Sequence, residues 1–247
     1  MRHALLLVPA LFVAACGSRG ANKPVDPAAP VVSAKPTTRV PVEEPEDDVG
    51  VTVVNARGHM EQAVIEEGLS PHTEDLTACY MTKVNRRRWL GGHVVVHWDI
   101  KKDGTVTAVK LSESDLGAWP IEKCLLDVAR SATFGRPVGG DADFSVPLDF
   151  TAKGKLITWE EDKGLKAVGG QTVKLDKCAK GKVPAPSDVT VTVYVGPAGK
   201  AQSVGFSSAK TTIDDAWADC AEKAALAWRL PDPRGIVAKL AIKYRSH

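Results

Sequence analysis

The chain has 247 residues, of which 44% are hydrophobic and 25% are charged, so it can bury one large core or two small ones. Its formal net charge of +2 at pH 7 is close to neutral, which excludes a nucleic-acid binder that relies on bulk positive charge. Its five cysteines are an odd number, which in an exported protein leaves one thiol to be explained.

The N-terminus has the features of an export signal. Arg2 supplies positive charge, and the almost unbroken apolar run that follows is too short to span a bilayer. The segment Val13-Ala14-Ala15-Cys16 resembles the bacterial lipobox, in which the cysteine is acylated and becomes the first residue of the mature protein. We therefore predict that residues 1–15 are a signal peptide and that Cys16 is lipidated. An ordinary cleaved signal with a coincidental cysteine is the alternative.

A lipidated Cys16 would anchor the protein to a membrane, since each buried methylene contributes about 0.8 kcal/mol. The next residue, Gly17, is not acidic, which favours the outer membrane, facing the periplasm or the cell surface. Residues 16–58 are rich in Pro, Ala and acidic side chains without apolar periodicity, and they predict a disordered linker.

The first predicted folded module covers residues 59–151. Ser70-Pro71 is typical of an N-cap followed by proline at the first helical position, and helical spacing then continues through Cys79 to Val84. From His93 the period becomes two, with an Asp103-Gly104 turn and a second β-rich run to Leu111, which predicts an antiparallel hairpin.

A second helix is predicted from about Ala118 to Ala132, with Cys124 on its apolar stripe. The alternating segment Phe144 to Phe150 predicts a closing strand. The order helix, strand, strand, helix, strand predicts an α+β fold in which helices cover an antiparallel sheet.

The pattern then repeats over residues 170–247, after a predicted linker at 152–169. Cys178 and Cys220 bracket a second hairpin, and the landmarks after the second cysteine keep the same spacing in both copies. The second copy is predicted to be trimmed at its start, where only a short turn of helix remains before Cys178. The chain is therefore predicted to hold two tandem small modules.

Several motifs of the first module together resemble the TonB C-terminal-like fold, and more closely the C-terminal domain shared by the AgmX and PglI proteins of gliding bacteria. The motifs are Cys79-Tyr80, Gly92-His93-Val94-Val95-Val96, Lys102-Asp103-Gly104-Thr105-Val106, Cys124, Phe134-Gly135-Arg136-Pro137 and Val146-Pro147-Leu148-Asp149-Phe150. The resemblance covers residues 60–151 well and 172–245 only in skeleton. It implies an envelope location, paired cysteines within each module and contact with proteins, and it brings no catalytic residues.

In an oxidising compartment, inward-facing cysteines on two helices of one small module are expected to pair. We therefore expect the disulfides Cys79–Cys124 and Cys178–Cys220, each within one module. Free buried thiols are the alternative. No Cys-x-x-Cys motif occurs, which argues against redox chemistry.

Few other side chains suggest a site. Arg86, Arg87, Arg88 and Trp89 follow the first helix and could contact lipid phosphates, peptidoglycan or a partner, although the helix dipole alone favours basic residues there. His93 and His97 share a strand face but lie about 13 Å apart at strand rise, too far to bind one metal ion. Trp119 and Trp217 are more typical of core than of a ligand platform.

These features predict a membrane-anchored lipoprotein of the cell envelope that binds envelope proteins, through an exposed sheet edge among other routes. No catalytic motif, metal site or cofactor site is recognised, so an enzyme is not expected, and no nucleic-acid partner is expected. The alternative is a cell-wall or small-ligand binding module, or an enzyme with an unrecognised site.

Overall fold

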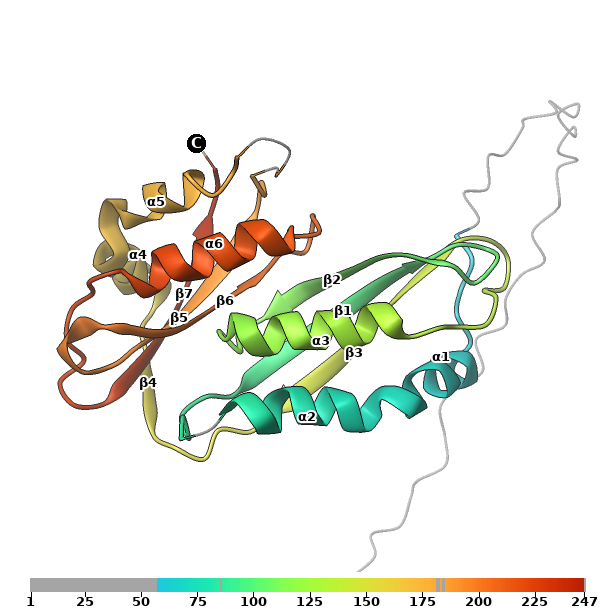
Figure 1. Cartoon of the computed structure of the whole chain (residues 1–247), viewed down its shortest axis with the longest axis horizontal. Coiled ribbons are helices and arrows are strands. Elements are labelled where there is room, and N and C mark those ends of the chain that lie inside the picture. The colour runs from blue at the N-terminus through green and yellow to red at the C-terminus, as the bar shows by residue number, and fades with distance from the viewer. Residues whose placement is uncertain (1–56, 85, 181–182, 184, 247) are drawn as a thin grey trace, which may run out of the picture. The chain divides into compact units, whose positions relative to one another are not determined.

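The computed structural model describes residues 57–84, 86–180, 183 and 185–246 (Figure 1). The predicted signal peptide, Cys16 and nearly all of the predicted linker at 16–58 lie outside the described residues. Among the residues that are described, none of the helices has the length and apolar character needed to cross a membrane.

The first half is a three-stranded antiparallel sheet with helices on one face, in the strand order β2-β1-β3. This arrangement confirms the predicted α+β class for this half and the order of its elements. In chain order the elements are α1 (Gln62–Leu69), the 3-10 turn η1 (Ser70–His72), α2 (Thr73–Val84), β1 (Gly92–Ile100), β2 (Val106–Ser114), α3 (Trp119–Ser131) and β3 (Ala142–Phe150).

The central strand β1 alternates as its sequence predicts. Val94, Val96, Trp98 and Ile100 face the helices and are at most 2% exposed, while His93 and its alternate neighbours face the other side. The hairpin closes at Gly104, whose φ of +92° lies in the left-handed region that glycine adopts without steric cost. The Asp103 carboxylate accepts a hydrogen bond from the Thr105 amide at 2.9 Å and fixes this turn.

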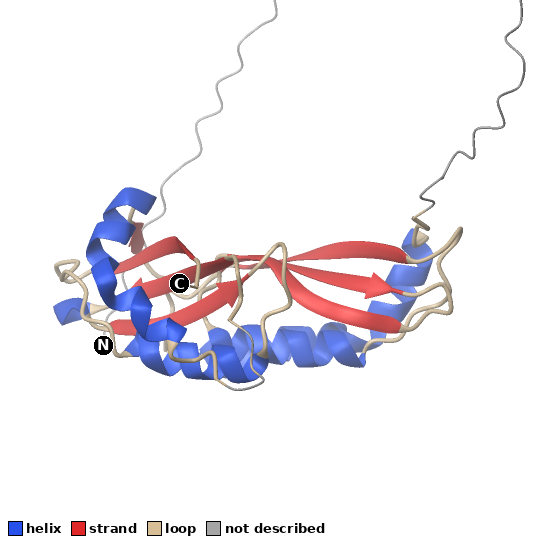
Figure 2. Ribbon diagram, turned by 90° about the horizontal axis from the view of Figure 1, so that it is seen from above, coloured by secondary structure: helices blue, strands red, loops and turns tan. Residues whose placement is uncertain are grey.

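Helices α2 and α3 lie on the same face of the first sheet (Figures 1 and 2). Trp98 reaches from the sheet to α3, where its indole N–H donates to the Ala129 carbonyl at 3.0 Å. Its ring stacks on Phe144 with 5.1 Å between ring centroids, and Phe134 packs edge-on against both rings. A single aromatic cluster thus ties the helix layer to β1 and β3.

The start of the first half differs from the sequence prediction. Ser70 is not an N-cap: α1 precedes it and runs through the 3-10 turn at Ser70–His72 into α2. Pro71 can stand at this junction because it occupies the first turn of a helical segment, where its missing N–H costs little. The helix α1 has no buried residue, because its inner face at Val64, Ile65 and Leu69 is only half-buried.

The second half has a four-stranded sheet in the order β4-β7-β5-β6, in which β4 is parallel to β7 and the other pairs are antiparallel. Its elements are β4 (Leu156–Thr158), α4 (Glu161–Val168), the 3-10 turn η2 (Gly169–Thr172), α5 (Val173–Asp176), β5 (Val189–Val195), the 3-10 turn η3 (Pro197–Gly199), β6 (Ala201–Ser207), α6 (Asp215–Leu226) and β7 (Val237–Tyr244).

The segment predicted to be a linker, residues 152–169, instead contains β4 and α4. Three residues are too few to give a strand signal, and β4 exists because β7 offers it an edge: the Trp159 amide donates to the Lys239 carbonyl at 2.8 Å. The sequence predicted an antiparallel second sheet, and this prediction is wrong for β4, which is parallel to β7.

The second copy is also not trimmed at its start. Gln62, the first residue of α1, precedes Cys79 by 17 residues, and Glu161, the first residue of α4, precedes Cys178 by the same 17 residues. Each eight-residue helix is followed by a 3-10 turn and a second helix that leads to the cysteine. The shortening lies instead in that second helix, which has 12 residues in α2 and four in α5.

The two halves belong to one compact unit with a continuous core. The strand β5 is buried on both faces, because Thr192 and Tyr194, which point away from the helices of their own half, are covered by the first half. The Thr192 hydroxyl donates to the Ser114 carbonyl and the Tyr194 hydroxyl donates to the Gly91 carbonyl, at 3.4 and 2.7 Å. We call this contact the seam.

Candidate functional site

The four cysteines of the folded unit form the two expected disulfides. Cys79 is bonded to Cys124 and Cys178 to Cys220, each with 5.6 Å between Cα atoms. Cys79 lies on α2, whereas Cys178 lies two residues after α5. Each bridge thus joins the segment before a hairpin to the helix after it, within one half of the unit. Each bridge fastens the helix layer of its own half, and neither bridge links the two halves.

The predicted partner-binding residues do not converge on a cavity. Arg86, Arg87 and Arg88 are exposed in the loop after α2, whereas Trp89 is half-buried and packs on Tyr194 with 4.8 Å between ring centroids. Trp89 therefore serves the seam. Only the three arginines are free to meet a partner.

The strand edges show where a partner strand could add. The outer edges of β2 and β6 are covered at the seam, where the Ser208 amide after β6 donates to the Leu111 carbonyl of β2 at 2.9 Å. On its outer side β7 is paired by β4 over three residues only, Val237 to Lys239. Among the described residues, β2, β3 and β6 are the outermost long strands of their sheets, and the outer edge of β3 lies away from the seam.

The register of β3 sets which of its groups face outward. Pro147 pairs with Val95 of β1 and has no N–H to give, so the odd-numbered positions of β3 point away from β1. Ser145 and Asp149 consequently present outward amides on either side of Pro147. The beginning of this edge is occupied, since the Gly58 amide donates to the Asp141 carbonyl and Arg57 pairs with Asp143 at 2.7 Å.

A groove of about 520 Å³ runs beside the free part of β3. Ile65 and Leu69 of α1 and Val146 of β3 give it an apolar floor, and polar side chains of the helices form its rim. Its lining residues are Gln62, Ile65, Glu66, Leu69, Ser70, Thr73, Ser145, Val146 and Pro147. An outward row of backbone groups beside an apolar groove is the arrangement that binds extended peptides.

The seam contains a buried carboxylate that sequence analysis did not single out. Glu122 of α3 is fully buried and accepts hydrogen bonds from the Ser114 hydroxyl, the Gly117 amide and the Phe206 amide at 2.6, 3.2 and 2.9 Å. Phe206 lies on β6, so the Glu122 side chain occupies part of the outer edge of β6. Burial raises the pKa of Glu122 to about 7, against the lowering effect of these hydrogen bonds.

A weak signal for Glu122 is present in the sequence. Trp119, Leu126 and Ala129 lie three before, four after and seven after it, so the four residues share one helical stripe in addition to the stripe of Cys124. A helix with two buried stripes touches two partners, and the first partner is its own sheet. The second partner is the other half of the unit, which local periodicity cannot identify.

Further polar contacts cross the seam at its edge. Asp219 of α6 accepts hydrogen bonds from the Trp119 indole and the Lys123 ammonium, both at 2.7 Å. Arg130 of α3 makes two hydrogen bonds of 2.9 Å to Asp215 at the start of α6. Trp119 and Trp217 are both buried in the core, as their sequence context suggested.

A second groove, of about 500 Å³, opens at the seam on the sheet face away from the helices. Three of its four ionisable side chains are engaged with neighbours: His93 bonds to Asp149 at 2.8 Å, Asp115 pairs with Lys239 at 2.9 Å, and Lys243 donates to the Thr190 hydroxyl at 2.7 Å. The fourth is Glu113. The hydrogen bond to Asp149 raises the pKa of His93. No group of three potential metal ligands occurs among the described residues.

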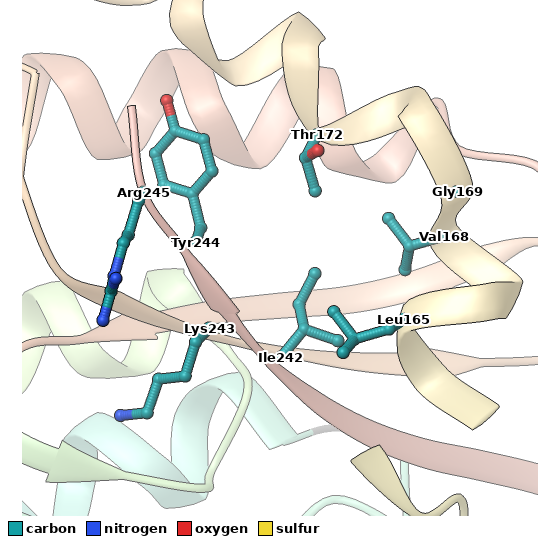
Figure 3. A pocket seen from close by; sticks show the side chains of 8 residues that line it. All are labelled: Leu165, Val168, Gly169, Thr172, Ile242, Lys243, Tyr244 and Arg245. Atoms are coloured by element: carbon teal, nitrogen blue, oxygen red, sulfur yellow. The ribbon is translucent and has the colours of Figure 1, made fainter. Parts of the chain in front are cut away.

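A third hollow, of about 360 Å³, lies between α4 and the end of β7 (Figure 3). The side chains of Leu165, Val168 and Ile242 lie close together at one end of it, whereas Lys243 and Arg245 extend away on the other side. Its lining residues are Leu165, Val168, Gly169, Thr172, Ile242, Lys243, Tyr244 and Arg245. Of the residues that the structure describes, no carboxylate, histidine or cysteine lines this hollow; its polar side chains are those of Thr172, Lys243, Tyr244 and Arg245.

The comparisons with known proteins bring no relative: no family model matches the chain, no curated protein matches it, and no solved structure matches it.

Proposed function

We propose that this protein is a lipid-anchored, non-catalytic adaptor of the cell envelope that binds an extended segment of a partner protein along β3. The observation that carries the proposal is the edge of β3, which no other described strand pairs, beside an apolar groove. Backbone pairing would supply affinity, and the groove would select the side chains that point into it.

The edge is limited in length, and this limits the partner. Arg57 and Gly58 occupy one end of the edge through their contacts with Asp143 and Asp141, and Pro147 removes one of the outward donors. Natural edge strands use proline in this way to prevent indiscriminate pairing. A partner segment is therefore expected to be short, with an apolar side chain over Val146 and backbone donors opposite the remaining carbonyls.

The other parts of the proposal come from the sequence. The lipobox at Cys16 supports membrane anchoring, and the resemblance to TonB C-terminal-like domains supports protein contact in the envelope. In the seam groove, His93 and Asp115 are each engaged with a residue outside the groove, and this favours a structural over a catalytic role for these two side chains.

A crosslinking experiment in intact cells tests the proposal. A photoreactive residue placed at Pro147, on the β3 edge, is expected to give a discrete adduct with one envelope protein. The same residue at Thr107, which is exposed on β2, serves as the control and should give none. Equal labelling from both positions, or no adduct from Pro147, would overturn the proposal.

A second variant connects the adduct to backbone pairing. Ser145→Pro removes one outward amide of β3 and leaves the pairing with β1 intact, as Pro147 does two residues later. The adduct formed from position 147 should decrease strongly in this variant while its unfolding midpoint stays near that of the parent. An unchanged adduct would show that the partner does not pair with β3.

A further inference from the structure

Two segments that are far apart in the sequence together present six cationic side chains at one end of the first half. Lys83 lies in the last turn of α2, Arg86 to Arg88 follow the helix, and Lys153 and Lys155 lie in the connection from β3 to β4. The Arg88 carbonyl accepts hydrogen bonds from the amides of Lys153 and Gly154, at 2.8 and 2.6 Å. We call Lys83, Arg86, Arg87, Arg88, Lys153 and Lys155 the basic cluster.

The backbone of the cluster is fixed by the fold. Gly154 approaches the loop so closely that a Cβ atom on it would lie 2.9 Å from the Arg88 carbonyl carbon and from the Trp89 nitrogen. Trp89 packs on Tyr194, and Leu90 is fully buried, so the loop is held from the inside as well. The cationic side chains therefore project from a preformed surface.

These charges are not neutralised within the unit. All six side chains are exposed, and none of them forms an ion pair within 4.0 Å with any residue the structure describes. The acidic group that Arg87 influences is Glu222, whose pKa is raised by burial and lowered in part by this arginine. Six unpaired cations on one surface make a local positive field, although the net charge of the chain is only +2.

The surroundings of the cluster favour a flat anionic surface over a discrete ligand. Lys83 borders a hollow of about 400 Å³ beside α3 and α6, and the other five side chains line neither this hollow nor the three grooves described above. Met81, two residues before Lys83, is 63% exposed, and Ile157, two residues after Lys155, is 37% exposed. Exposed apolar side chains next to basic ones are typical of surfaces that adsorb to lipid headgroups.

We propose that the basic cluster docks the folded unit on the phosphate groups of an anionic phospholipid bilayer. Guanidinium groups bind phosphate oxygens in a bidentate manner, and lysines add point charges that are attracted to the same surface. This contact is separate from the β3 edge, and it does not depend on acylation of Cys16. Together with a lipidated Cys16, it would hold the folded unit against the bilayer surface.

Vesicle co-sedimentation tests the proposal with the full chain carrying Cys16→Ser, so that no attached lipid contributes. Binding to vesicles that contain phosphatidylglycerol should exceed binding to pure phosphatidylcholine, and the excess should disappear at high salt. The triple variant R86E/R87E/R88E is expected to lose about tenfold or more in affinity for the anionic vesicles. Equal binding of the parent to both vesicle types would overturn the proposal.

A matched control separates the cluster from bulk charge. K166E/K174E/K177E makes the same change in net charge at exposed lysines of α4, α5 and the residue after α5, and it should keep nearly the affinity of the parent. An equal loss in both triple variants would mean that only net charge matters. If the arginine variant fails to fold, K153E/K155E tests the other segment of the cluster, with the same expected direction.

A competing partner is an acidic protein. Soluble polyglutamate should displace the parent from anionic vesicles only weakly at matched charge concentration, because it has no phosphate groups and no interface for Met81. Displacement as strong as that by phosphatidylglycerol vesicles themselves would show that the cluster recognises acidic polypeptides, and the lipid proposal would then be wrong.

Discussion

The Glu122 carboxylate of α3 lies 2.9 Å from the backbone nitrogen of Phe206, a residue of β6 in the other half of the unit. This hydrogen bond joins a helix of the first copy to a strand edge of the second. It places a titratable group at the contact that makes two small modules into one unit.

The stability of the unit is expected to depend on pH through Glu122. Burial raises its folded pKa from 4.5 to about 7, so the favourable contribution is complete below pH 4.5 and is lost as the pH rises through 7. The loss corresponds to about 3 kcal/mol at most. Glu122→Gln should flatten the change of unfolding free energy with pH, measured by urea denaturation across this range.

The matched control for that measurement is Glu67→Gln, on the exposed surface of α1, which should keep the pH dependence of the parent. The Ser114 hydroxyl lies 2.6 Å from the Glu122 carboxyl group, so it is placed to accept a hydrogen bond when Glu122 is protonated. A slope that is the same in parent and E122Q would contradict this role.

The seam should not tolerate a side chain at Gly205. A Cβ atom there would overlap both Glu122 carboxylate oxygens and lie 2.6 Å from the Ala118 nitrogen. We expect Gly205→Ala to lower the unfolding free energy by about 2 kcal/mol, within the usual range for overpacking a core. Gly170→Ala is the control, because nothing lies within 4 Å of its Cβ position, and its stability should be unchanged or slightly higher.

Both disulfides should stabilise the unit by similar amounts. They close segments with sequence separations of 45 and 42 residues, which correspond to about 4 kcal/mol each in the chain-entropy model. C79A/C124A and C178A/C220A should each lower the urea midpoint, and reductant should then lower it further through the remaining bridge. Variants with the midpoint of the oxidised parent would show that the bridges lie outside the cooperative unit.

The sequence by itself determined the local architecture. The Asp103-Gly104 turn, the alternation of β1 and the helical spacing around Cys124 and Cys220 predicted both hairpins and the helices that follow them. These patterns are local, because the period of side chains along a helix or strand is set within a few residues. The repeated spacing of the cysteines also predicted both disulfides correctly.

Only the tertiary structure decided the rest. The strand β4 forms because β7 offers an edge, Glu122 is buried because the second half covers it, and the basic cluster arises because Gly154 lies against Arg88. Each of these features joins residues that are distant in the chain and individually unremarkable in type. Periodicity reports which face of an element is apolar, but not which other element covers that face. The packing between elements also decides that no described strand pairs with the outer edge of β3.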